Sequence, residues 1–125
     1  MKKIASGFTL IEVLVALAIF AVAVASLSGA IQNNVKNATY LKNKTVAHWI
    51  ASNKMVELLQ TGKYPPLTDR VDKVEYAGRE WVVNTQVKKQ GAEYARGVFI
   101  SAGIQGEEDD PNYFATVFTI VTSLK

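Results

Sequence analysis

The chain has 125 residues, a length that is enough for one domain, and 49% of its residues are hydrophobic. Its formal net charge is +3, but no basic patch with interleaved aromatic residues accompanies it, so the composition does not favour nucleic-acid binding. The chain has no cysteine, which excludes disulfides, cysteine-ligated zinc and thiol catalysis.

An apolar segment runs over residues 8–31 and carries no charge from Val13 onward. A helix needs roughly 20 apolar residues to cross a bilayer core, so this segment is long enough. Lys2 and Lys3 precede it, which predicts a cytoplasmic N-terminus and a C-terminal part across the membrane. Two interpretations compete: a retained single-span anchor, or a secretory signal peptide cut before Ser26 after the small residues of 21–25.

Glu12 favours the retained anchor. A charge deep in an apolar helix costs about 2.5–3.5 kcal/mol, and a signal peptide that is discarded has no use for it. A cut between Gly7 and Phe8 would create an ammonium group four residues before Glu12. The two charges could then neutralise one another, within one chain or between two chains.

Residues 32–62 continue the helix beyond the membrane as an amphipathic segment. Apolar and small residues recur at spacings of three and four, which predicts the face that packs on the rest of the chain. These residues are Ile31, Val35, Ala38, Leu41, Thr45, Trp49, Ser52, Val56 and Leu59. The helix is expected to end near Thr61 and Gly62, because Pro65 and Pro66 follow.

Residues 63–125 form a predicted β head. Strands are expected at 80–87, 97–102 and 113–124, with a short one at 74–76. Turns are expected at Ala77-Gly78, at Gln90-Gly91 and over 106–112. The predicted fold is therefore α+β, with a long N-terminal helix packed on a small antiparallel sheet of three to four strands.

The candidate functional residues beyond the apolar segment do not form a catalytic set. His48 is the single histidine and lies in mid-helix, where a helix-surface or interface role is expected. Trp49 and Trp81 either anchor subunit contacts or fill the core. The acidic run of residues 107–110 could bind calcium, but its spacing matches no EF-hand, so a solvated turn is expected and no metal or cofactor is predicted.

The sequence Gly7-Phe8-Thr9-Leu10-Ile11-Glu12-Val13-Leu14 resembles the class III signal of type IV pilins and type II secretion pseudopilins. The resemblance implies a pilin-like fold and a non-enzymatic filament subunit. It also implies that a prepilin peptidase removes residues 1–7 as a leader peptide and methylates the amine of Phe8. Glu12 would then recruit the first residue of a neighbouring subunit during assembly.

Two further segments narrow the family. Residues 44–54 (KTVAHWIASNK) and 77–81 (AGREW) are similar to the I-type minor pseudopilin of type II secretion, whereas the acidic stretch 106–112 has no place in that pattern. The resemblance implies a single-pass bacterial inner-membrane protein with a periplasmic head. It would join the J- and K-type minor pseudopilins and the major pseudopilin at the pseudopilus tip and support export of folded proteins. A type IV pilus minor pilin and a Sec-exported soluble binding domain remain the alternatives.

Overall fold

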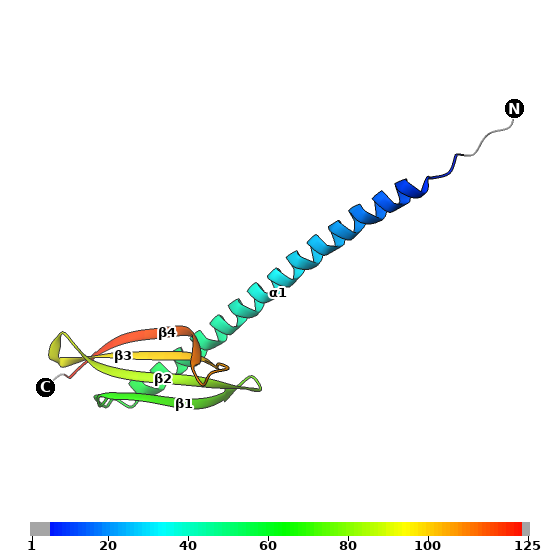
Figure 1. Ribbon diagram of the computed structural model, residues 1–125. Helices are drawn as coiled ribbons and strands as arrows, with labels where there is room; N and C mark the ends of the chain where they lie inside the picture. The colour runs from blue at the N-terminus through cyan, green and yellow to red at the C-terminus, as the bar shows by residue number, and fades with distance from the viewer. Residues whose placement is uncertain (1–5, 124–125) are drawn as a thin grey trace. The chain divides into compact units, whose positions relative to one another are not determined.

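The computed structural model describes residues 6–123, so residues 1–5 of the expected leader, residue 124 of the expected strand 113–124 and residue 125 lie outside the described residues. In chain order the elements are α1 (Leu10–Gln60), β1 (Thr68–Tyr76), β2 (Arg79–Gln90), β3 (Ala92–Gln105) and β4 (Pro111–Thr122) (Figure 1). Internal contacts divide the chain into two compact units, with the boundary between Thr39 and Tyr40.

The first unit holds the N-terminal part of α1. Its apolar side chains are exposed, Leu17 and Phe20 among them. The helix is long and apolar enough to cross a membrane, with a mean hydropathy of 2.7 in its most apolar window. It begins at Leu10, two residues after the predicted start, because Thr9 occupies the N-cap position.

The second unit contains the sheet and the C-terminal turns of α1. The four strands form one open antiparallel sheet in the order β1-β2-β3-β4, which confirms the predicted α+β fold (Figure 1). Ala77 and Gly78 both have positive φ, 52° and 72°, and join β1 to β2 as the sequence predicted. The helix ends at Gln60, and the amide of Gly62, with φ +62°, donates to the Leu59 carbonyl, as expected of a glycine cap.

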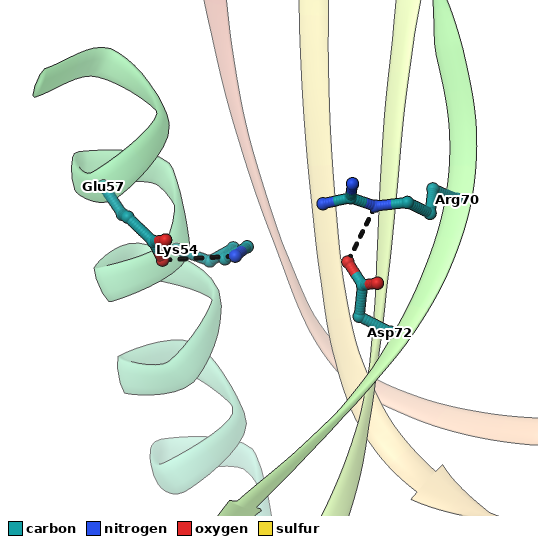
Figure 2. Close-up of polar contacts among 4 residues, drawn as sticks. All are labelled: Lys54, Glu57, Arg70 and Asp72. Atoms are coloured by element: carbon teal, nitrogen blue, oxygen red, sulfur yellow. Dashed lines mark hydrogen bonds and ion pairs between the residues drawn. The ribbon is translucent and has the colours of Figure 1, made fainter. Parts of the chain in front are cut away.

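Strand β3 covers Ala92–Gln105, where a strand over 97–102 was expected. Strand β1 is also longer than predicted. It starts at Thr68, six residues before the expected start, and pairs with β2 from Thr68↔Val87 to Tyr76↔Arg79. Its charged residues have low β propensity, which hid the strand in the sequence. Two ion pairs show how the structure places such charges at the surface: Lys54–Glu57 on α1 (3.2 Å) and Arg70–Asp72 on β1 (2.9 Å) (Figure 2).

The core lies between α1 and one face of the sheet. One helix face and alternate residues of β2 and β3 build it, as the two periodicities require. Its buried members are Ala47, Ile50, Ala51, Met55, Trp81, Val83, Val87, Val98, Ile100 and Ala102.

The predicted packing face of α1 was wrong. The helix buries Ala47, Ile50, Ala51 and Met55, whereas Trp49 of the predicted face is 54% exposed. The helix has apolar residues on two opposite sides, so periodicity alone could not choose between them. The structure uses the side with Ala47 and Ala51, because small side chains let a helix lie close to a sheet.

Thr85 is a weak point of this core. Its side chain is 4% exposed, and its hydroxyl has no hydrogen-bond partner among the described residues. A buried hydroxyl without a partner is costly, so Thr85→Val should raise the free energy of unfolding by about 1 kcal/mol. Urea unfolding of the detergent-solubilised chain measures the change. The control is Thr116→Val, because the Thr116 hydroxyl lies at the surface and has a partner in the Ser101 hydroxyl at 2.8 Å. Equal stabilisation by the two variants would contradict this explanation.

Candidate functional site

The start of α1 is built as a capping box around Thr9 and Glu12. The Thr9 amide donates to Glu12 Oε2 at 3.0 Å, and the Glu12 amide donates to Thr9 Oγ1 at 3.3 Å. Two amides that the helix leaves free are thus satisfied reciprocally. The carboxylate also lies in the first helical turn, where the helix dipole favours a negative charge.

Sequence reasoning had assigned Glu12 an assembly role but missed this local one. The signal was present, because Thr9-x-x-Glu12 before an apolar run is the sequence pattern of a capping box. In the free chain the carboxylate is therefore already hydrogen-bonded. Its contact with any neighbour must replace or share that bond.

A shallow, open apolar surface with a volume of about 520 Å³ lies beside this carboxylate. Its lining residues are Phe8, Glu12, Val13, Ala16, Leu17 and Phe20. Glu12 is the one ionisable side chain in that lining, on the part of the chain that the structure describes. In a membrane, a positively charged group at this surface would meet a single carboxylate flanked by apolar side chains, and charge pairing there is stronger than in water.

Gly7 and Phe8 precede the helix in exposed, non-helical chain. A Cβ at Gly7 would meet no heavy atom within 4 Å, so the fold itself does not require glycine there. The bond between the two residues is accessible to another protein.

The second unit presents an apolar stripe on the side of α1 opposite the core, which we call the outer helix face. Its members are Leu41, Thr45, Trp49, Ser52, Val56 and Leu59. Five of them are exposed and Ser52 is half-buried. Large apolar side chains that recur along one exposed helix face are typical of a surface that another chain covers.

The three candidate interface residues take different positions. Trp49 and His48 are exposed on α1, and His48 borders a groove of about 480 Å³ with Leu41, Lys44, Thr45 and the β4 residues Phe114, Ala115 and Thr116. Trp81 is 3% exposed, and its Nε1 donates to the Tyr76 carbonyl at 3.2 Å. Trp81 is therefore a core residue, and its side chain cannot serve as a surface anchor.

The acidic run forms a tight turn before β4. The Gly106 amide donates to the Asp110 carbonyl at 3.1 Å, and Gln105 Nε2 donates to Asp109 Oδ1 at 2.8 Å. Glu107, Glu108, Asp109 and Asp110 are all exposed. Across residues 6–123, no three acidic or histidine side chains are grouped as a metal ion would require.

Two family models match the chain. The model described as "Type II secretion system (T2SS), protein I" matches residues 41–121, and the "Prokaryotic N-terminal methylation motif" matches residues 2–28. The first covers the C-terminal turns of α1 and nearly all of the sheet. The second covers the capping box and the apolar part of the helix.

Several curated relatives share the name "Type II secretion system protein I". The relative from Pseudomonas aeruginosa is 46% identical over 99 residues, which are 78% of this chain and 76% of the relative. The one from Klebsiella pneumoniae is 30% identical over 123 residues, 98% of this chain and 99% of the relative. The one from Vibrio cholerae is 37% identical over 75 residues, 60% and 62% of the two chains.

The apolar N-terminal helix, the four-stranded sheet and these matches agree over nearly the whole chain. The chain belongs to the protein I family of the type II secretion system, as a membrane-anchored minor pseudopilin with a structural role.

Proposed function

We propose that this chain assembles with the J- and K-type minor pseudopilins at the pseudopilus tip, where the complex initiates the filament. The observation that carries the proposal is the outer helix face. One side of α1 packs in the chain's own core, and the opposite side leaves Trp49, Val56 and Leu59 uncovered. Neighbouring helices of the same kind would cover such a face.

Processing prepares the other end of the helix for joining. The prepilin peptidase cuts between Gly7 and Phe8 and methylates the new amine, as the matched methylation motif supports. The Phe8 ammonium of one subunit then pairs with Glu12 of a neighbour in an apolar environment. The pair neutralises two charges that would each be costly in a membrane.

The expected topology follows from the charge distribution. Residues 1–7 are the cytoplasmic leader, 8–31 span the inner membrane, and 32–62 with 63–125 form the periplasmic part. Lys2 and Lys3 before the span support this orientation. The type IV pilus alternative shares the N-terminal motif, but the match to the protein I model over residues 41–121 favours type II secretion.

The outer helix face provides the test of the tip assignment. Trp49→Lys should lower copurification of the J- and K-type subunits with the full chain by roughly tenfold or more, because tryptophan is a frequent interface anchor. Asn53→Lys is the control, at another exposed helix position outside the stripe. Equal copurification with both variants would contradict the proposal, as would a parent chain that captures neither subunit.

A further inference from the structure

The two edges of the sheet differ in charge. In the order β1-β2-β3-β4, β1 and β4 are the edge strands, and no strand within residues 6–123 pairs with the outer side of either (Figure 1). Edge strands of soluble domains are commonly protected by charges, prolines or bulges, because their free backbone groups otherwise pair with other chains.

Strand β1 carries this protection. Five of its nine residues are charged, namely Asp69, Arg70, Asp72, Lys73 and Glu75. Arg70 and Asp72 pair along the strand (Figure 2), and Lys73 pairs with Glu80 of β2 at 3.1 Å. A strand added to this edge would have to accommodate these side chains, so pairing there is disfavoured.

Strand β4 lacks it. Its sequence, PNYFATVFTIVT, has no charged residue over twelve positions. The register with β3 shifts once, where Ala102 faces Ala115 but Gly103 faces Tyr113, so the irregularity is confined to the first part of the strand. Gly103 lies at this irregularity, where the two strands come so close that any side chain would overlap the Asn112 main-chain oxygen. From Ala115 to Thr122 the register is unbroken.

The alternation of antiparallel pairing identifies the free backbone groups of this regular stretch. The Ser123 amide donates to the Tyr94 carbonyl at 2.9 Å, so the odd-numbered residues of β4 direct their backbone groups toward β3. The N–H and C=O groups of Thr116, Phe118, Ile120 and Thr122 therefore point away from the sheet. Phe118 and Ile120 are also 50% and 52% exposed, and the Phe118 ring packs on Phe99 with centroids 4.6 Å apart.

The ends of the strand constrain what could pair with it. The turn before β4 holds Glu107, Glu108, Asp109 and Asp110, and the ion pairs among residues 6–123 include none of them. A second β4 laid along the first would contribute another acidic turn and no charge within its own length. A partner strand that is uncharged where it lies along β4, and that has a lysine or arginine beside the acidic turn, is complementary to the uncharged strand and to the acidic turn.

We infer that the outer edge of β4, over residues 115–122, binds an extended strand of a different protein subunit. That strand is uncharged along its length, presents apolar side chains to Phe118 and Ile120, and carries basic residues beside the acidic turn. Main-chain hydrogen bonds to the four outward-pointing residues hold it, and the side chains select it. The inference rests on the proposed function, because it adds a second surface to a subunit that the outer helix face already joins to neighbours.

Paired substitutions at Ile120 test backbone pairing directly in the full chain, within the assembled system. Ile120→Pro removes an outward N–H without removing a bond to β3, whereas Ile120→Thr keeps that N–H and removes the apolar side chain. A photo-crosslinking residue in place of Thr122 forms a covalent adduct with whichever protein lies beside the β4 edge, and the adduct identifies that protein. The adduct with a different subunit should fall roughly tenfold with Ile120→Pro and stay within about twofold with Ile120→Thr.

A photo-crosslinking residue in place of Val71, on the charged edge, is the matched control and should form no comparable adduct. This comparison needs no proline, so it holds even where Ile120→Pro weakens the fold. Equal adducts from the two edges, adducts with a second copy of this chain alone, or equal loss in both Ile120 variants would overturn the inference. A chain that copurifies with the J- and K-type subunits but forms no β4 adduct refutes the edge and leaves the proposed function intact.

Discussion

Glu12→Ala is expected to yield a processed, membrane-resident chain that joins other subunits poorly. Removal of one partner of a buried ion pair leaves an uncompensated charge, which in the proposed pair is the neighbour's Phe8 ammonium, at a cost of roughly 3–5 kcal/mol. Cleavage should continue, because the proposed cut lies between Gly7 and Phe8, four residues before Glu12. In-cell crosslinking to the J- and K-type subunits, beside a blot for leader removal, measures both.

The capping box supplies the control for this result. Thr9→Ala removes the hydroxyl that accepts from the Glu12 amide but keeps the carboxylate, and loss of such a cap costs about 1 kcal/mol. If Glu12 acts between subunits, Thr9→Ala should assemble far better than Glu12→Ala, and Glu12→Asp should be intermediate. If both alanine variants assemble equally badly, the carboxylate is a helix cap and no more. Full crosslinking by Glu12→Ala would mean that head contacts suffice.

Trp81→Ala is expected to lower the free energy of unfolding of the head by roughly 3–5 kcal/mol. The indole is buried in the core between α1 and the sheet, and its N–H has a partner in the Tyr76 carbonyl. Trp81→Phe should cost less, because it keeps most of the packing and loses mainly the hydrogen bond, worth about 1 kcal/mol. Urea unfolding of the detergent-solubilised chain, read by proteolysis of the unfolded head, measures each change.

Trp49→Ala is the matched control for Trp81. Its side chain is more than half exposed, so the expected change in stability is within about 0.5 kcal/mol. The two tryptophans thus separate a core role from a surface role within one head. Similar destabilisation by the two alanine substitutions would contradict a buried Trp81 and an exposed Trp49.

The sequence predicted the elements better than their packing. The strands around Trp81, Phe99 and Phe118 are dense in β-branched and aromatic residues, and the turns at Gly78 and Gly91 have positive φ, so local chemistry was sufficient to place them. The helix end at Gln60 was equally readable from the glycine and prolines that follow.

The choice of helix face could not be made from the sequence. A chain whose helix contacts its own sheet on one side and is apolar on the other has two stripes of similar hydropathy. The larger residues, Trp49 and Val56, gave the stronger signal, but the structure buries Ala47 and Ala51. Which stripe packs depends on how closely the sheet can approach, a tertiary property that periodicity does not contain.

The roles of the candidate site residues stay a prediction, and the structure adds a local geometry that the sequence analysis did not include. Gly7, Phe8 and Glu12 were identified by their order along the chain, whereas the reciprocal bonds between Thr9 and Glu12 went unnoticed. The contrast between the charged β1 edge and the uncharged β4 edge also required the strand order, because sequence alone does not say which strands are edges.

The mass of the intact protein extracted from the membrane of cells with an active prepilin peptidase tests the central claim most directly. A retained, processed filament subunit predicts a chain that begins at N-methylated Phe8. Gly7→Val should keep residues 1–7 attached, since the chain itself has room for that side chain and any loss must arise at the peptidase. A soluble product that begins at Ser26, or a parent chain that keeps its leader, would contradict the account.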